Sequence, residues 1–341
     1  MKKQNECLNF FKGLACILVV SLHVRFPVAA IDGPLQCMAR FAVPLFFMIS
    51  GYYCCYDRVE DYKKKIPSKI VHIGKICIIS FVFWIIMQFA VYMFGAGEHN
   101  IMDLVKSILG LKALLRLLLL NDDPVISILW FLLALLYCYV IYYICAKRNI
   151  VQILPKLIIP CLIIHFILGN VGSGLLNWTI DVEYYRNVWF MALPLFSIGH
   201  EIKRYQSQIL EKIDSSKAFY LIVGGMGLSL VEWGIVGGRQ QMYIGSMMMA
   251  VGMVVYSIWN SQNYIIKIIA VIGQRYSSVV YVIHIAVGIM LDKMMRIIGL
   301  QDAIMYILLK QMMVIVLSVI IAGILVECNK KLLAKRRRTE V

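Results

Sequence analysis

The stretch ISILWFLLALLYCYVIYYIC, residues 126–145, contains no charged side chain. A helix needs about twenty apolar residues to cross roughly 30 Å of hydrocarbon. Similar apolar runs occur at 76–94 and 304–326. Over the 341 residues, 61% are hydrophobic and 16% charged, which does not provide the charged surface of a soluble domain. The sequence therefore predicts an all-α fold, a polytopic membrane helical bundle.

About ten segments have the apolar character of membrane-spanning helices, and the sixth is short. We expect them to form a single integral-membrane domain, 1–341, without an internal repeat. The predicted spans are 9–29, 37–56, 73–95, 126–146, 151–170, 187–199, 218–236, 242–260, 276–295 and 304–328.

The basic residues predict how the spans are oriented. A net charge of +15 would suggest nucleic acid in a soluble protein, but in a membrane protein Lys and Arg collect in cytoplasmic loops. Here they concentrate after even-numbered spans, in 58–75, at Lys147-Arg148 and at Lys203-Arg204, and in both termini. We therefore expect both termini to be cytoplasmic, and we expect no nucleic-acid partner.

Three apolar segments need a separate interpretation. Residues 103–120 carry Lys106, Lys112 and Arg116, which are costly in a lipid-exposed span, so we expect an amphipathic helix on the outer surface. Residues 265–273 are too short to span and are expected to re-enter or lie flat. The run 14–22 lacks a following signal-peptide cleavage site and is interpreted as a retained first helix.

The ten cysteines are scattered, mostly inside apolar runs, and show no metal-ligand spacing. They are expected to be buried thiols. The sequence predicts neither a metal site nor a permanently bound cofactor.

Ionisable residues inside spans are costly and are candidates for function. Lys12 and His23 are eleven residues apart, so on a helix they share one face at a separation of about 16 Å. Lys12 lies near the cytoplasmic end and His23 in the outer half. The alternatives are a structural hydrogen bond for His23 and a Lys12 ammonium that extends to the interface.

Later spans add further polar candidates. Arg40 is expected at a depth similar to that of His23, or as an anchor at the outer headgroups. Ser50 stands before Gly51, where close helix packing is an equally good explanation. His284 lies within the ninth span, and a purely structural role there is the simpler interpretation. His72 and His200 fall at cytoplasmic boundaries and are expected to be solvated.

These motifs resemble acyltransferase family 3, the bacterial integral-membrane O-acyltransferases that act on cell-surface glycans. The first motif is Lys12-Gly13 followed by His23, and the second is Val43, Phe46-Phe47 and Ser50-Gly51. Weaker similarities are Leu129-Trp130-Phe131-Leu132, Arg186-Asn187 through Gly199, and the series Gly273, Ser277, Tyr281 and His284.

The resemblance implies a membrane acyltransferase that moves an acyl group, expected to be acetyl, from cytoplasmic acyl-CoA to a hydroxyl. The acceptor would be an extracytoplasmic glycan or its lipid-linked precursor. His23 would act as general base or as transient acyl carrier. Arg40, Ser50 and His284 are further catalytic candidates. Lys12, Lys65 and Lys69 would bind the phosphates of acetyl-CoA, the donor substrate.

Two further expectations follow from the resemblance. The protein would be a multi-pass protein of the bacterial cytoplasmic membrane, with membrane lipid around it. Lys12 stands where the family more often has Arg, which keeps the charge but loses the bidentate fork. The alternative function is transport of a small polar substrate such as an amino acid, as in the membrane part of membrane-bound serine racemases. Broken helices or inverted repeats would favour that alternative.

Overall fold

The computed structural model describes residues 5–93, 108, 110–122, 125–237, 240–262 and 266–339. Within these ranges the chain is helical and contains no β-strand. Eight helical segments within the described ranges, some of them made of two or three consecutive helices, are long and apolar enough to cross a membrane. The predicted polytopic helical bundle is therefore confirmed. The basic residues Met1-Lys2-Lys3 lie outside the described ranges.

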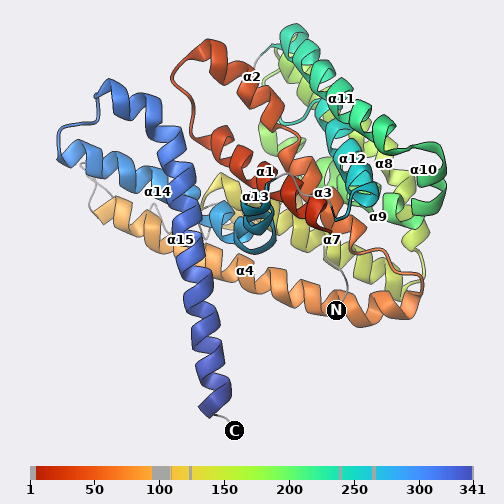
Figure 1. Cartoon of the computed structure of the whole chain (residues 1–341). Helices are drawn as coiled ribbons and strands as arrows, with labels where there is room; N and C mark the ends of the chain where they lie inside the picture. The colour runs from red at the N-terminus through yellow and green to blue at the C-terminus, as the bar shows by residue number, and fades with distance from the viewer. Residues whose placement is uncertain are drawn as a thin grey trace. The chain divides into compact units, whose positions relative to one another are not determined.

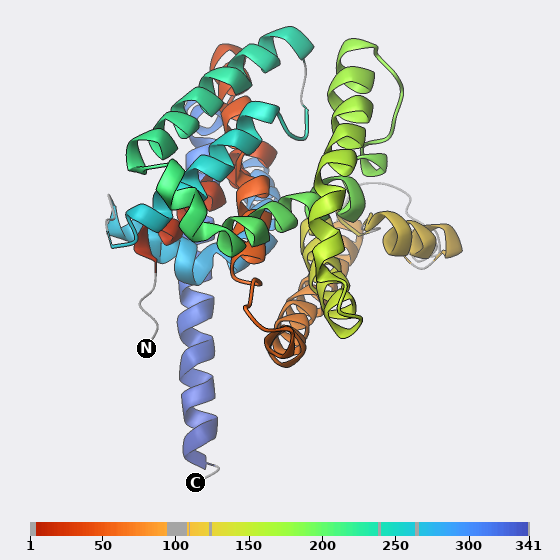
Figure 2. The same cartoon turned by 90° about the vertical axis from the view of Figure 1, so that its right-hand side faces the viewer.

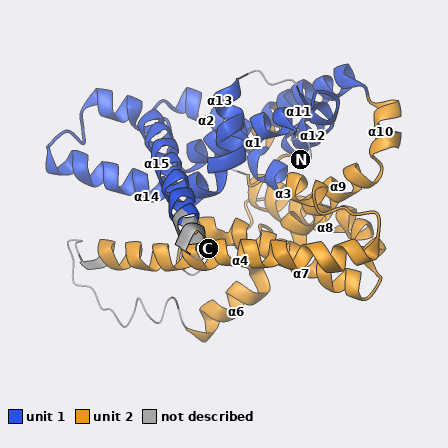
Figure 3. Ribbon diagram, turned by 60° about the horizontal axis from the view of Figure 1, so that its bottom comes forward, with its two compact units in different colours: residues 1–46, 214–230, 244–341 blue, residues 47–213, 231–243 orange. Residues whose placement is uncertain are grey.

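The chain divides into two compact units, each described here by itself (Figure 3). Unit 1 comprises 1–46, 214–230 and 244–341, and unit 2 comprises 47–213 and 231–243. The chain begins with α1 (Glu6–His23), α2 (Ala29–Ala39) and α3 (Ala42–Tyr52), which ends in unit 2. The later helices of unit 1 are α11 (Ser215–Val236), α12 (Ile244–Trp259), α13 (Lys267–Val271), π-helical η6 (Ile272–Tyr276), α14 (Ser277–Ile297) and α15 (Ile304–Thr339).

The helices of unit 2 follow α3 (Figure 1). They are α4 (Val59–Met93), α6 (Leu111–Leu120), η1 (Ser127–Leu129), α7 (Trp130–Lys147), η2 (Val151–Leu157), α8 (Ile158–Phe166), π-helical η3 (Ile167–Leu175), η4 (Val182–Tyr184), π-helical η5 (Val188–Ala192), α9 (Leu193–Arg204) and α10 (Gln206–Lys212).

In unit 1, α1 is the central helix. It contacts α2, α12, α13, η6, α14 and α15. The α14–α15 pair is antiparallel, since Lys310 pairs with Asp292 near the connecting turn. The C-terminal part of α15 extends beyond the other helices of this unit (Figures 1 and 2).

The first two predicted spans have different boundaries in the structure. α1 ends at His23 rather than at residue 29, because Phe26 precedes Pro27 and a residue before proline avoids the helical conformation. The second span begins at Ala29 rather than at residue 37, and it breaks between α2 and α3. Pro44 explains the break, since it has no N–H to donate to the carbonyl of Arg40. Arg40 caps α2 in the middle of this span.

Residues 267–297 form one continuous helical segment through α13, η6 and α14. The expectation that 265–273 re-enters or lies flat was therefore wrong for its described part, which extends the ninth span. Residues 263–265 lie outside the described ranges.

Two predicted spans correspond to shorter helices. The eighth is α12, with 16 residues. The sixth comprises η5 and α9, from Val188 to Arg204.

Contacts within unit 2 agree with the charge-based orientation. Two loops assigned to the cytoplasm meet, because the Tyr52 hydroxyl donates to Gln206 and the Tyr62 hydroxyl lies 2.6 Å from His200 Nε2. Two segments assigned to the outside also meet, because Asn121 Oδ1 accepts from the backbone N–H of Val188. The side of the membrane on which each end lies stays a prediction.

Candidate functional site

A glycine contact sets the register of α1 against the ninth span in unit 1. A Cβ atom on Gly13 would overlap the backbone oxygen of Ile269, and one on Gly273 would overlap that of Asn9. The two backbones touch at this level, as small residues allow in membrane bundles. Three residues after Gly13, the Cys16 thiol lies 3.7 Å from the backbone oxygen of Ser277. The two segments therefore run in the same direction from this contact.

This register brings the two predicted intramembrane histidines together. His23 is ten residues beyond Gly13 and His284 is eleven beyond Gly273, which are nearly equal helical rises. Their ring centroids lie 5.2 Å apart. His23 is exposed as the last residue of α1, whereas His284 is completely buried. His23 is the last residue of α1, whereas the predicted span continued to residue 29.

The hydrogen bonds of His284 fix its tautomer. Its Nδ1 lies 3.1 Å from the backbone oxygen of Val280 and 2.8 Å from that of Tyr281. Both oxygens only accept, so Nδ1 carries a proton. Nε2 is buried and has no hydrogen-bond partner within the described part of the chain. In the neutral ring, Nε2 therefore presents a lone pair beside His23.

Lys12 lies on the same face of α1 as His23, about 16 Å away along a continuous helix. Its side chain is half-buried, and it forms no ion pair with a carboxylate among the described residues. A half-buried ammonium without a counter-ion suits an anionic ligand.

Two residues that the sequence analysis missed contact the outer end of α1. Asp32 accepts from the backbone N–H of Phe26 at 3.0 Å, and the Gln36 amide donates to the backbone oxygen of Ser21. Both are buried. Arg40 lies about one turn beyond Gln36 and caps the C-terminal end of α2, and the expectation that it matches His23 in depth stays a prediction. Asp32 was missed because the predicted second span began after it.

Unit 2 contains a second glycine contact, between α3 and α9. A Cβ on Gly51 would overlap the backbone oxygen of Phe196, and one on Gly199 would overlap that of Met48. The packing explanation of Ser50-Gly51 therefore holds for Gly51. Ser50 hydrogen-bonds the Tyr139 side chain.

Lys65 and Lys69 gather at one aromatic ring in unit 2. Their ammonium groups lie 4.8 Å and 5.6 Å from the centre of the Tyr56 ring. Lys69 also donates to the backbone oxygen of Tyr53, and Lys65 pairs with Asp61 at 3.0 Å. One turn of α4 separates the two lysines, so both charges face the loop that follows α3.

His200 was expected to be solvated but is 2% exposed. Its Nδ1 lies 2.8 Å from Glu201 Oε1, and its Nε2 lies 2.6 Å from the Tyr62 hydroxyl. The expectation of a solvated His200 was wrong because the contact between Gly51 and Gly199 packs the end of α9 against the loop after α3.

The described part of 103–120 forms α6, a ten-residue helix of about 15 Å that does not span a bilayer. Arg116 pairs with Asp122 and Glu183. Leu111, Leu118 and Leu119 are exposed, as suits a helix lying in a membrane interface. Residues 103–107 and 109 lie outside the described ranges.

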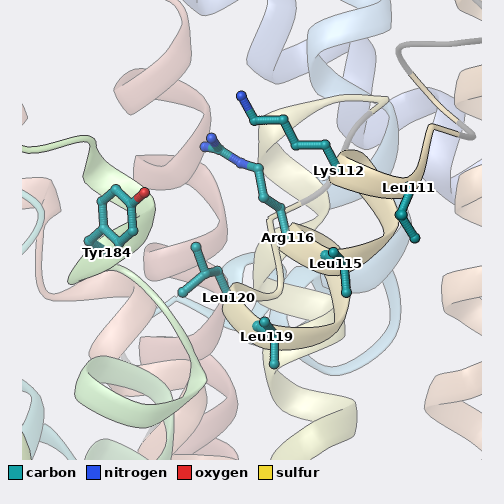
Figure 4. A pocket seen from close by; sticks show the side chains of 7 residues that line it. All are labelled: Leu111, Lys112, Leu115, Arg116, Leu119, Leu120 and Tyr184. Atoms are coloured by element: carbon teal, nitrogen blue, oxygen red, sulfur yellow. The ribbon is translucent and has the colours of Figure 1, made fainter.

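A groove of about 600 Å³ runs between α6 and Tyr184. Its lining is almost entirely apolar, with the charged ends of Lys112 and Arg116 at the edge (Figure 4). Among the aromatic residues of the segment before η5, which the sequence assigns to an outer loop, Trp178 and Tyr184 are exposed but Tyr185 is buried.

The model of the family described as Acyltransferase domain, acyltransferase family 3, matches residues 5–326. The chain belongs to this family. The resemblance inferred from the first-helix and second-helix motifs is thereby confirmed, and the protein is a multi-pass membrane acyltransferase. Comparison with curated proteins gave no match. Comparison with solved structures gave none either.

Proposed function

We propose that this acyltransferase moves an acetyl group from cytoplasmic acetyl-CoA to a hydroxyl of an extracytoplasmic glycan or of its lipid-linked precursor. It would do so in the bacterial cytoplasmic membrane. The observation that carries the proposal is the contact between His23 and His284, because His23 shares one face of α1 with Lys12.

The pair supports proton transfer from the acceptor hydroxyl. His284 is held as the Nδ1–H tautomer, so its Nε2 lone pair is available to accept a proton or to orient His23. His23 is the accessible member of the pair and is the group that meets the substrates. It acts either as general base or as transient acyl carrier. Arg40 remains a candidate for stabilising the oxyanion.

The cationic residues support the choice of donor. Coenzyme A carries several phosphate charges, which ammonium groups bind as point charges. Lys12 in unit 1, and Lys65 with Lys69 in unit 2, stand at ends assigned to the cytoplasm by the distribution of basic residues. Ser50 is a weaker catalytic candidate, because its contact with Tyr139 and the packing of Gly51 explain it structurally.

The test uses the full chain in detergent or nanodiscs with radiolabelled acetyl-CoA. We expect slow release of free CoA from the wild type, by hydrolysis where no acceptor is present. His23→Ala is expected to reduce the rate roughly 100-fold or more, as for loss of a general base or nucleophile. Lys12→Ala is expected to weaken acetyl-CoA binding.

The controls are His72→Ala and Lys217→Ala, which remove an exposed histidine and an exposed lysine outside these sites. Both are expected to behave as wild type. If well-folded protein neither binds nor consumes acetyl-CoA or longer acyl-CoAs, the donor proposal is wrong. Equal losses in His23→Ala and His72→Ala would remove His23 from the mechanism.

A second candidate function is transport of a small polar substrate such as an amino acid. The break between α2 and α3 favours it, because discontinuous helices with a charged residue at mid-span are typical of transporter sites. Uptake of labelled amino acids into proteoliposomes tests this candidate. Uptake that is lost in Arg40→Gln and kept in His23→Ala would favour transport over acyl transfer.

A further inference from the structure

Four side chains at one end of unit 2 form a connected hydrogen-bonded chain. The Tyr62 hydroxyl lies 3.9 Å from Cys55 Sγ and 2.6 Å from His200 Nε2. Cys55 also lies within hydrogen-bonding reach of His200. The other ring nitrogen of His200 contacts Glu201 at 2.8 Å. We call Cys55, Tyr62, His200 and Glu201 the Cys55 relay.

The hydrogen bonds of the Tyr62 oxygen allow two proton arrangements. The backbone N–H of Tyr56 donates to this oxygen at 3.1 Å in both. In the first arrangement, the Cys55 thiol donates to Tyr62, and Tyr62 donates to a neutral His200. In the second, an imidazolium donates to Tyr62, and Tyr62 donates to the Cys55 thiolate. Moving one proton from sulfur to oxygen and another from oxygen to nitrogen converts the first into the second.

We propose that Cys55 is a nucleophilic thiol that takes the acyl group from the thioester donor and holds it as a thioester of the protein. The inference rests on the proposed donor. Donor phosphates bound by Lys65 and Lys69 would lie beside Tyr56, whose ring packs edge-on against Tyr62 at 5.1 Å. The relay is therefore adjacent to the cationic site in the same unit.

The surroundings of His200 suit the charged imidazole ring that the second arrangement requires. The Glu201 carboxylate accepts from Nδ1 and stabilises an imidazolium, and Arg204 lies 4.0 Å from the same Oε1 atom. The order along the relay is carboxylate, imidazole, phenol and thiol, so Tyr62 connects the base that a cysteine nucleophile needs to the Cys55 thiol.

The two adjacent cysteines, Cys54 and Cys55, differ in burial and therefore in accessibility to a substrate. Cys54 is completely buried, and burial raises the pKa of its thiol to about 12. Cys55 is partly exposed, so a substrate can reach it. A reactive cysteine needs both access and an activating base, and Cys55 has both.

The proposed step is a balanced thioester exchange. Cys55 Sγ bonds to the carbonyl carbon of the donor, and the bond from that carbon to the coenzyme sulfur breaks. The thiol proton passes through Tyr62 to His200 and then to the leaving thiolate. The products are the acyl-Cys55 thioester and coenzyme A with a free thiol, without oxidation or reduction.

The first experiment follows the acyl group. The full chain is incubated with radiolabelled acetyl-CoA, denatured in acid and digested, and the labelled peptide is identified by mass spectrometry. We expect a hydroxylamine-labile label on the Cys55 peptide, absent in Cys55→Ser and at least tenfold slower to form in His200→Gln. Cys328→Ser, which removes an exposed cysteine on α15, is the matched control and should keep the label.

The second experiment does not depend on the donor. Alkylation by iodoacetamide is timed at each cysteine of the wild type, Tyr62→Phe and His200→Gln proteins at pH 7. Cys55 should react at least tenfold faster than Cys328 in the wild type, and this advantage should disappear in both variants. Equal rates at Cys55 and Cys328 in the wild type would overturn the relay.

The outcomes separate this inference from the proposed function. Acetyl-CoA consumption that continues at the wild-type rate in Cys55→Ser, without any labelled peptide, overturns the inference and leaves the donor proposal intact. If no protein consumes any acyl-CoA, the donor proposal fails and the acyl-carrier role fails with it. The alkylation rates then decide whether Cys55 is an activated thiol.

Discussion

The two units use the same packing device with different results. In unit 1 the contact of Gly13 and Gly273 places His284 against His23, with backbone carbonyls as the partners of His284. In unit 2 the contact of Gly51 and Gly199 places His200 against Tyr62, with Glu201 as its partner. A carbonyl partner fixes a tautomer, whereas a carboxylate partner stabilises the charged ring.

The difference suggests a division of chemistry. A neutral histidine with a free Nε2 suits removal of a proton from a hydroxyl, and a histidine beside a carboxylate suits activation of a thiol. In unit 1 the two histidines meet about three turns beyond the glycine contact, whereas in unit 2 His200 directly follows Gly199. Substitutions at these positions should therefore separate the two roles.

The largest effect is expected at the histidine pair. His284→Asn keeps a side-chain N–H for the backbone oxygens of Val280 and Tyr281 but removes the Nε2 lone pair. We expect the rate of acyl transfer to fall roughly 100-fold, as for loss of a proton acceptor. Rates of acetyl-CoA consumption and circular dichroism of the purified protein measure activity and fold.

His165→Asn is the matched control for this prediction. His165 in unit 2 is also completely buried, with Nδ1 2.8 Å from the backbone oxygen of Tyr185 and Nε2 without a partner within the described chain. It should lose no more than a few-fold in rate. Equal losses in the two variants would mean that any buried histidine matters structurally.

The glycine contacts should give the next largest effect. Gly13→Ala and Gly51→Ala each place a methyl group against a backbone oxygen that cannot move away. We expect the free energy of unfolding to fall by about 1–3 kcal/mol in each case. Thermal unfolding in detergent measures the change.

Gly227→Ala is the control for the glycine substitutions, because nothing lies within 4 Å of a Cβ at that helical position. It should leave the unfolding temperature unchanged or raise it, since alanine favours a helix. Gly51→Ala should also slow alkylation of Cys55, whereas Gly13→Ala should not. If both leave Cys55 unaffected, the contact in unit 2 does not position the relay.

A smaller effect is expected for the cationic site of unit 2. Lys69→Gln removes a charge held near Tyr56 and Tyr139, 5.5 Å from the Tyr139 ring centre. We expect acetyl-CoA to bind roughly tenfold more weakly, as for loss of one hydrogen bond to a charged group of about 1.5 kcal/mol. Lys63→Gln, an exposed lysine in the first turns of α4, should bind as wild type.

The smallest effect is expected for the stability of unit 2 when Arg116, beside the groove at α6, is replaced. Arg116→Gln removes partly exposed ion pairs with Asp122 and Glu183. Because such pairs are partly screened by solvent, we expect a loss of no more than about 1 kcal/mol in stability. Thermal unfolding at low and high salt measures it, and a decrease as large as that of Gly51→Ala would contradict the prediction.

Local sequence patterns alone predicted most of the helices and some of the contacts between their ends. The apolar runs predicted the helices, and the basic loops predicted which ends of unit 2 meet. The eleven-residue spacing placed Lys12 and His23 on one face, because the geometry of a helix depends only on its own sequence. Boundaries failed where proline acts, at Pro27 and Pro44, since hydropathy does not register a missing N–H.

Only the tertiary structure decided which distant residues meet. His284 is 261 positions from His23, and His200 is 145 positions from Cys55. Hydropathy cannot choose helix partners, because lipid is as apolar as the helices are and rewards no particular pairing. Backbone contacts at a few glycines determine which helices pair. The sequence displays those glycines, but only the folded chain shows which pairs of helices they join.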